Sequence, residues 1–130
     1  MSNIDLKTCE IENMRIESTQ LGYGDYHFLT FWMHLQGGSC GQGFGGYGLD
    51  SYNREKDARE PHPFAGACIE QILTVVGVEY WEDLPGKYLR VIRKGSSDAI
   101  IGIQNILDDK LTFFPAEFFK QHFAEQVTTD

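Results

Sequence analysis

The sequence predicts an α+β fold, with an antiparallel, strongly bent sheet of about five to six strands, one central helix and a short C-terminal helix. Three observations lead to this prediction. Apolar residues alternate along residues 26–35, they recur with helical spacing over residues 63–77, and glycine-containing turns separate several short apolar runs. Alternation is typical of strands, and the i, i+3, i+4, i+7 spacing is typical of amphipathic helices. Short runs joined by glycine turns favour antiparallel pairing.

The first strands are expected over residues 11–19 and 26–35, around a turn at 21–26, "LGYGDY". The second of these strands, "YHFLTFWMHL", carries the strongest alternation in the chain. One face holds Leu29, Phe31, Met33 and Leu35, and the other holds Phe28, Thr30, Trp32 and His34. Because the second face is also aromatic, we expect the C-terminal hairpin or another subunit to cover it. A homo-oligomer therefore stays open.

Residues 38–50, "GSCGQGFGGYGLD", hold six glycines. On a strand, Gly41, Gly43 and Gly45 would share one face, and a face without side chains lets another group approach closely. One interpretation is that the central helix packs there, with Gly66 easing the approach. The other is that a ligand or partner sits against the exposed amides, beside Phe44 and Tyr47.

The spacing of Gly41, Gly43 and Gly46 spells GxGxxG, the pattern of dinucleotide-binding loops. In those loops the glycines open a helix directly after a strand. Here a charged segment and Pro61 come before the next helical pattern, so this site is excluded. No GxxxxGK[ST] pattern is present either.

The remaining elements follow in chain order. We expect residues 51–63 to form an exposed loop and residues 63–77 the central helix, begun by Pro63 and ended by Gly77, with Cys68 in its core stripe. A short helical turn, strands at 87–94 and 99–107, a short strand at 108–114 and a helix from Pro115 complete the chain. The predicted organisation is a flexible arm at 1–10, one domain at 11–125 and a tail at 126–130.

Composition limits the partners and the location. Nineteen acidic residues against eleven Lys and Arg give a net charge of −8, which disfavours binding to duplex nucleic acid. No apolar run reaches the roughly 18 residues of a membrane span, and the polar N-terminus does not resemble a signal peptide. Three widely spaced cysteines form no CxxC pair. We therefore expect a soluble cytoplasmic protein with reduced thiols.

Catalytic and metal chemistry find little support in the residue pattern. His27 and His34 lie an odd number of positions apart, so one strand would point them to opposite faces. Cys40 and His62 are the only nucleophile–base pair that the composition suggests, and nothing in the sequence brings them together. We expect no metal, no cofactor and no enzymatic activity.

Basic side chains gather in two places, and they leave two interpretations open. Arg54 and Arg59 lie in the segment before the central helix, and Arg90 and Arg93 lie on the strand at 87–94. They are expected to be solvated and weakly paired with acids. Alternatively they bind a phosphorylated small molecule near the N-terminus of the helix, where backbone amides favour anions.

Three segments together resemble a family of small, mostly uncharacterised proteins of bacteriophages and prophages. They are "GQGFGGYGLD" at 41–50, "VVGVEYWEDLPGKYLRV" at 75–91 and "IIGIQNI" at 100–106, and the similarity covers about residues 15–115. The chain departs from the family pattern at "LTFFP", where a tryptophan is usual. The resemblance implies a phage accessory protein of the host cytoplasm. Such proteins often disarm bacterial immunity, either by binding a defence complex, as anti-CRISPR proteins do, or by sequestering a signalling nucleotide.

Two functional hypotheses follow. In the first, the protein is a non-enzymatic anti-defence inhibitor that binds a bacterial defence protein or complex through Phe44, Tyr47, Asp50, Tyr52, Arg54 and Arg59. In the second, it is a sponge for a nucleotide messenger, with phosphate candidates Arg54, Arg59, Arg90 and Arg93.

Overall fold

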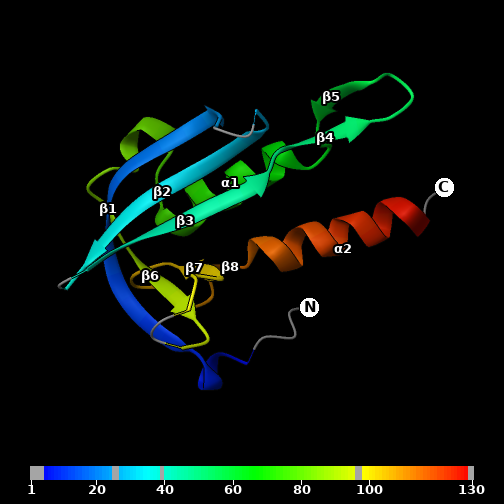
Figure 1. The fold of residues 1–130 in the computed structure, drawn as a ribbon. Helices are drawn as coiled ribbons and strands as arrows, with labels where there is room; N and C mark the ends of the chain where they lie inside the picture. Colours follow the sequence, from blue (N-terminus) through cyan, green and yellow to red (C-terminus); the bar gives the residue numbers. More distant parts are fainter. Residues whose placement is uncertain (1–4, 25–26, 39, 96–97, 129–130) are drawn as a thin grey trace.

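The computed structural model describes residues 5–24, 27–38, 40–95 and 98–128. It confirms the predicted α+β class: six antiparallel strands form one sheet in the order β3-β2-β1-β6-β7-β8, with a separate two-stranded hairpin and two α-helices (Figure 1). The strands of the sheet are β1 (Glu10–Tyr23), β2 (Leu29–Gly37), β3 (Cys40–Gly48), β6 (Tyr88–Arg93), β7 (Gly102–Gln104) and β8 (Thr112–Phe113). The hairpin pairs β4 (Asp50–Asn53) with β5 (Ala58–Pro61), and the helices are α1 (Ala65–Val76) and α2 (Pro115–Thr128). Short 3₁₀ helices lie at Leu6–Thr8 and Trp81–Asp83.

The sheet is curved strongly enough for side chains of distant strands to meet. Gln42 lies on β3 and Arg93 on β6, with β2 and β1 between them. Three strand spacings in a flat sheet would separate the backbones of these two residues by about 14 Å. The Arg93 guanidinium nevertheless donates a hydrogen bond of 2.7 Å to the Gln42 side chain. The face that carries Gln42 and Arg93 is therefore concave, and the opposite face is convex.

Arg93 holds this concave face together through charge as well. It is buried, and it donates to the carboxylates of Glu10, at 3.0 Å, and Glu12. Burial lowers the pKa of Arg93, but the two carboxylates more than offset this, so its pKa is raised overall. The guanidinium is thus a permanent cation that links β6 to both β1 and β3.

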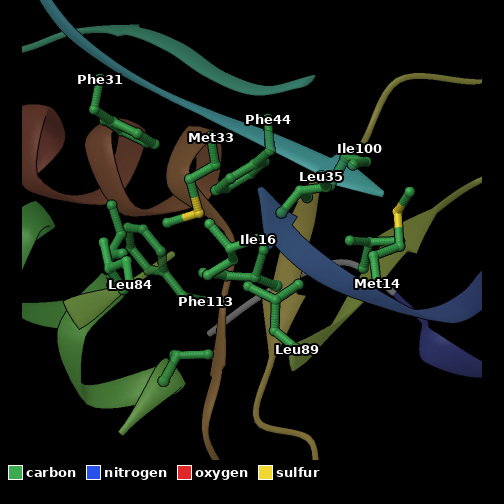
Figure 2. Packing of buried hydrophobic residues seen from close by; sticks show 14 of the residues in the cluster. Met14, Ile16, Phe31, Met33, Leu35, Phe44, Leu84, Leu89, Ile100 and Phe113 are labelled. Carbon is green, nitrogen blue, oxygen red and sulfur yellow. The ribbon is translucent and has the colours of Figure 1, made fainter. Parts of the chain in front are cut away.

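The core lies on the concave face. Ile16 of β1 and Met33 and Leu35 of β2 lie near Phe44 of β3 in the core, and Met14 of β1 lies farther along the sheet, on the side of Ile100, as Figure 2 shows. These side chains alternate along their strands as the sequence predicted, because every second residue of a strand points to the same face. The stripe of α1 that packs on this core consists of Cys68, Ile72 and Val75.

Helix α1 ends where the sequence predicted. Gly77 has φ +88°, and its N–H donates to the Leu73 carbonyl at 2.8 Å. The N–H of Val78 donates to the same carbonyl at 3.1 Å. Hydrogen bonds of this kind, from the residues just after a helix to a carbonyl of its last turn, are typical of helix C-termini. They require a left-handed residue, and glycine adopts that conformation without strain.

The buried position of Cys68 in α1 predicts a difference in thiol reactivity. Burial raises the pKa of Cys68 to about 12, whereas the Cys40 side chain is exposed. Since the thiolate is the reactive form, a thiol reagent at pH 8 is expected to label Cys40 in the folded protein and Cys68 only after unfolding. Mass spectrometry of labelled peptides measures this, and rapid labelling of native Cys68 would contradict its placement.

Several predicted boundaries need correction. Residues 51–63 were expected to form a loop, but they mostly belong to the β4–β5 hairpin, which projects beyond the sheet in Figure 1. The turn expected at 21–26 begins later, because β1 continues to Tyr23; residues 25 and 26 lie outside the described residues. Of the predicted arm, residues 1–4 are likewise not described, and Glu10 already belongs to β1. The predicted tail begins inside α2, which reaches Thr128; residues 129 and 130 are not described.

Candidate binding face

The outer, convex face of β3 consists of glycine, and an indole ring lies on it. In the register of the sheet, Gly41, Gly43 and Gly45 are opposite Gln36, His34 and Trp32 of β2. An added Cβ at Gly43 would lie 3.3 Å from Cζ3 of Trp32, and one at Gly46 would lie 2.6 Å from Cζ2. The six-membered ring of the indole thus spans both glycine positions, flat against the strand.

This arrangement corrects the expected use of the glycines. Helix α1 does not pack against them, because it covers the opposite, concave face with Cys68, Ile72 and Val75. A Cβ added at Gly66 of α1 would meet nothing within 4 Å, so this glycine does not mark a close approach. The group that approaches the glycine strand is the side chain of Trp32 from the neighbouring strand.

Two of the glycines also form a bulge in β3. The register shifts between Thr30 and Trp32 of β2, and Gly45 and Gly46 have φ +140° and +83°. Residues with a Cβ rarely adopt these angles, so the bulge requires glycine. The Thr30 hydroxyl, 2.7 Å from the Tyr47 carbonyl, donates to the bulged strand.

The indole forms the floor of a groove on the convex face. The groove has a volume of about 580 Å³, and we call it the Trp32 groove. Trp32 remains 38% exposed, so the sheet is not covered by the C-terminal hairpin as the sequence suggested. The lining residues are Gln20, Gly24, Phe28, Thr30, Trp32, His34, Gly43 and Gly46. None of the described acidic residues is among them.

The β4–β5 hairpin adjoins the groove, and we call it the hairpin arm. The guanidinium of Arg59 lies 5.9 Å from the ring centre of Phe28, which lines the groove. Arg59 also donates to the Asp50 carboxylate at 2.6 Å and so ties the base of the arm together. Tyr52 is opposite Arg59 in the hairpin register and is 51% exposed. Arg59 therefore connects the hairpin arm, where it lies opposite Tyr52, to Phe28 at the Trp32 groove.

The Arg59–Asp50 pair predicts an acid-sensitive arm. The hydrogen bond from Arg59 holds the pKa of Asp50 below its ordinary value and raises the pKa of Arg59. A carboxyl group with a lowered folded-state pKa stabilises the fold above its unfolded pKa, about 3.9, and loses that effect as the pH falls through the folded value. We expect Asp50→Asn to lower stability at pH 7 and to flatten the loss of stability below about pH 4. Urea unfolding between pH 2 and pH 7 measures this, and identical pH profiles would contradict it.

The predicted partner-binding residues separate into exposed and buried groups. Tyr52, Arg54 and Arg59 are exposed on the hairpin arm, whereas Asp50, which was expected to be exposed, is buried as the partner of Arg59. Phe44 was expected to be exposed, but it is 1% exposed and packs against Phe31 in the core. Tyr47 is half-buried and also stacks on Phe31, so it belongs with the core rather than with the surface.

The four predicted phosphate ligands do not come together in one site. Arg54 and Arg59 lie on the hairpin arm, whereas Arg90 and Arg93 lie on β6, at the far end of the sheet in Figure 1. Arg93 is buried between two carboxylates, and Arg90 donates to Gln104 at 3.0 Å. A shared phosphate site built from these four side chains is therefore wrong.

Metal-binding and membrane-spanning features are not found in the described part of the chain. There, no group of three or more His, Cys, Asp and Glu side chains could hold a metal ion. No helix in the same residues is long and apolar enough to cross a membrane.

Sequence reasoning placed Trp32 on the correct face but did not make it a site residue. The signal in the sequence was the register: an alternating run of glycines that follows a strand with a tryptophan on the same face can seat that tryptophan. Gln20 was missed for a different reason. It is opposite Trp32 in the β1–β2 register, but β1 was expected to end before it.

Comparisons of the chain with protein-family models, with curated proteins and with solved structures found no match.

Proposed function

We propose that this chain is a non-enzymatic binding protein that inhibits a bacterial immune component by occupying it through the hairpin arm and the Trp32 groove. The observation that carries this proposal is the exposure of Tyr52 and Arg59 on the hairpin arm and of Trp32 in the groove that the arm adjoins. Tryptophan, tyrosine and arginine are the residue types most enriched at the energetic centres of protein interfaces.

The contacts that hold these side chains in place support the proposal. Trp32 is held flat on β3, and the arm is tied by Arg59 to Asp50 and by Asn53, which donates to Glu60 at 3.2 Å. Side chains that are fixed before binding lose little freedom in a complex, so more of their contact energy is retained as affinity.

The choice of a bacterial defence protein as partner rests on the resemblance of residues 41–50, 75–91 and 100–106 to phage accessory proteins. The proposal accordingly places the chain in the cytoplasm of an infected host. An inhibitor that works by occupancy needs a surface and no reacting groups, and the face described above is such a surface.

The nucleotide sponge is the less supported alternative. A sponge needs cations free to neutralise phosphate, but Arg59 already pairs with Asp50, and Arg93 pairs with Glu10 and Glu12. A thermal-shift scan against linear and cyclic nucleotides tests it. A ligand present at about 100 times its dissociation constant would add about 2.7 kcal/mol to the free energy of unfolding.

Phage plaquing tests the main proposal. The protein is expressed in bacterial strains that each carry one defined defence system, and plating efficiency of a sensitive phage is measured. We expect the wild-type chain to raise it in at least one strain and the Trp32→Ala/Tyr52→Ala variant to fail. Tyr88→Ala is the matched control, because Tyr88 is 57% exposed on β6, away from the groove.

Three results would contradict the proposal. Absence of relief in every strain would remove the anti-defence role. Full relief by the Trp32→Ala/Tyr52→Ala variant would remove the proposed face. Complete inhibition of the purified target by far less than one equivalent of protein would indicate an enzyme, because an occupying inhibitor acts stoichiometrically.

A further inference from the structure

Strand β3 is one edge of the six-stranded sheet, so one side of its backbone has no neighbouring strand in that sheet. We propose that this edge pairs, antiparallel and about a two-fold axis, with the same edge of a second copy of this chain. The inference is separate from the proposed function, because it uses the edge of β3, whereas the defence component is proposed to bind the convex face and the hairpin arm. It assigns one interface to the homo-oligomer that the sequence left open.

The register of the β2–β3 hairpin shows which backbone groups of β3 point to the open side. Gly37 pairs with Cys40, and only two residues separate them, as in hairpins whose closing pair is hydrogen-bonded. Hydrogen-bonded and non-hydrogen-bonded pairs alternate along an antiparallel ladder. Gln42 therefore bonds to β2, whereas the N–H and C=O groups of Gly41 and Gly43 point away from it.

These outward groups are accessible to another strand. Gly41 and Gly43 are both exposed. In the part of the chain that the structure describes, β3 pairs only with β2, and no hydrogen bond reaches Gly41 or Gly43 from the open side. The bulge at Gly45 ends the regular part of the edge. Two glycines with four outward backbone groups are thus available for pairing.

The β3 edge also lacks the features by which proteins usually keep sheet edges apart. The common ones are charged side chains, prolines and very short strands. Residues 27–49, which include all of β2 and β3, contain no Asp, Glu, Lys, Arg or Pro, although 23% of the whole chain is charged. The opposite edge, β8, has two residues and is soon followed by Pro115. Of these two edges, β3 is the one that favours pairing.

A second copy is the partner that this edge fits. Two chains that each carry a net charge of −8 repel one another, so contact between them is favoured where acidic side chains are missing. The uncharged run 27–49 provides such a region, and self-pairing of β3 places no like charges opposite each other in the new ladder. Two antiparallel strands related by a two-fold axis are self-complementary, since each donates where the other accepts.

A two-fold axis at Gln42 uses every outward group. Gly41 of each copy then lies opposite Gly43 of the other copy, and each such pair exchanges two hydrogen bonds. Since neither glycine has a side chain, the two backbones can approach without displacing one on the convex face. Interfaces of this limited extent are typical of transient complexes, so we expect a reversible dimer with a Kd of about 10–100 µM.

Sedimentation velocity of the full chain tests the inference. The protein is measured from about 1 µM to about 300 µM in a reducing buffer, which prevents disulfides through the exposed Cys40. We expect a monomer–dimer equilibrium in this range. In ¹H–¹⁵N NMR over the same range, the Gly41 and Gly43 amides should exchange more slowly with solvent as the dimer forms. The Gln42 amide, which already bonds to β2, should change least.

Gly43→Pro and Gly43→Ala form a matched pair of variants. Proline is tolerated on an edge strand where its missing N–H would face solvent, so Gly43→Pro should fold but should dimerise at least about tenfold more weakly. Gly43→Ala also adds a Cβ but keeps the N–H, so it should dimerise like the wild type.

Three results would overturn the inference. A wild type that stays monomeric at about 300 µM would leave the edge to a strand of another protein. Equal Kd values for Gly43→Pro and the wild type would place the dimer contact elsewhere. An unfolded Gly43→Pro beside a folded Gly43→Ala would show that the N–H of Gly43 belongs to the ladder with β2.

Discussion

Replacement of Gly45 by valine is expected to lower the free energy of unfolding by about 3 kcal/mol or more. Its φ of +140° is strained for any residue with a Cβ, which contributes about 1–3 kcal/mol. The added Cβ would also overlap the Phe31 carbonyl oxygen and lie 2.9 Å from the Cα of Trp32. Both contacts are with backbone, so the clash cannot be relieved by rotating a side chain, and overpacking adds about 1–3 kcal/mol. Urea unfolding of the two proteins measures the difference.

Two control substitutions distinguish this effect from a general intolerance of glycine replacement. Gly43→Ala adds a methyl group 3.3 Å from the Trp32 ring, which only needs to shift slightly, so a small effect is expected. Gly66→Ala meets nothing within 4 Å inside α1, and it should stabilise the protein by about 0.5–1 kcal/mol. If Gly45→Val unfolds at the same urea concentration as the wild type, the bulge described for β3 is wrong.

Removal of both carboxylates that pair with Arg93 is expected to have a similarly large effect. In the Glu10→Gln/Glu12→Gln variant, a guanidinium that is 5% exposed would keep only the uncharged Gln42 and the new amides as partners. Loss of the partner charges of a buried ion costs about 3–5 kcal/mol, because the remaining charge stays desolvated. We expect the free energy of unfolding to fall by about that amount.

Replacement of Arg93 itself should lower the free energy of unfolding by less than loss of its two carboxylate partners, which makes the prediction specific. Arg93→Met keeps most of the side-chain volume and leaves Glu10 and Glu12, which are 40% and 34% exposed and can be hydrated. The expected loss is about 1–3 kcal/mol, the value of hydrogen bonds to charged groups. Denaturant unfolding of both variants compares the two losses. A larger loss for Arg93→Met than for the double variant would contradict the burial of the charge on Arg93.

The fold was largely predictable because period-two and period-3.6 patterns report on burial directly. The alternation of Phe31, Met33 and Leu35 fixed the core face of β2, and Gly77 fixed the end of α1. The hairpin arm was missed because its residues are mostly exposed on both faces. Such a strand pair has no apolar alternation to detect and is held by polar contacts such as Arg59–Asp50.

The binding face was only partly predictable, for a reason of geometry. Sequence reasoning correctly recognised that the glycines of residues 38–50 admit a close neighbour. The identity of that neighbour depends on the register between β2 and β3, which places Trp32 opposite Gly45 and includes a bulge. Bulges shift the register by one residue, and a shift of one residue exchanges the two faces of a strand. Phe44 was assigned to the surface for a different reason: it precedes the bulge and alternates regularly with Gly43, but the glycine segment as a whole was expected to be exposed.

The proposed binding face is tested most sharply by the affinity of the purified protein for the defence component that it relieves, measured by calorimetry. We expect one-to-one binding that Trp32→Ala weakens at least about 30-fold, corresponding to about 2 kcal/mol, while Tyr88→Ala binds like the wild type. Equal affinities of wild type and Trp32→Ala, with both proteins folded, would show that the partner binds elsewhere and would contradict the assignment of the Trp32 groove.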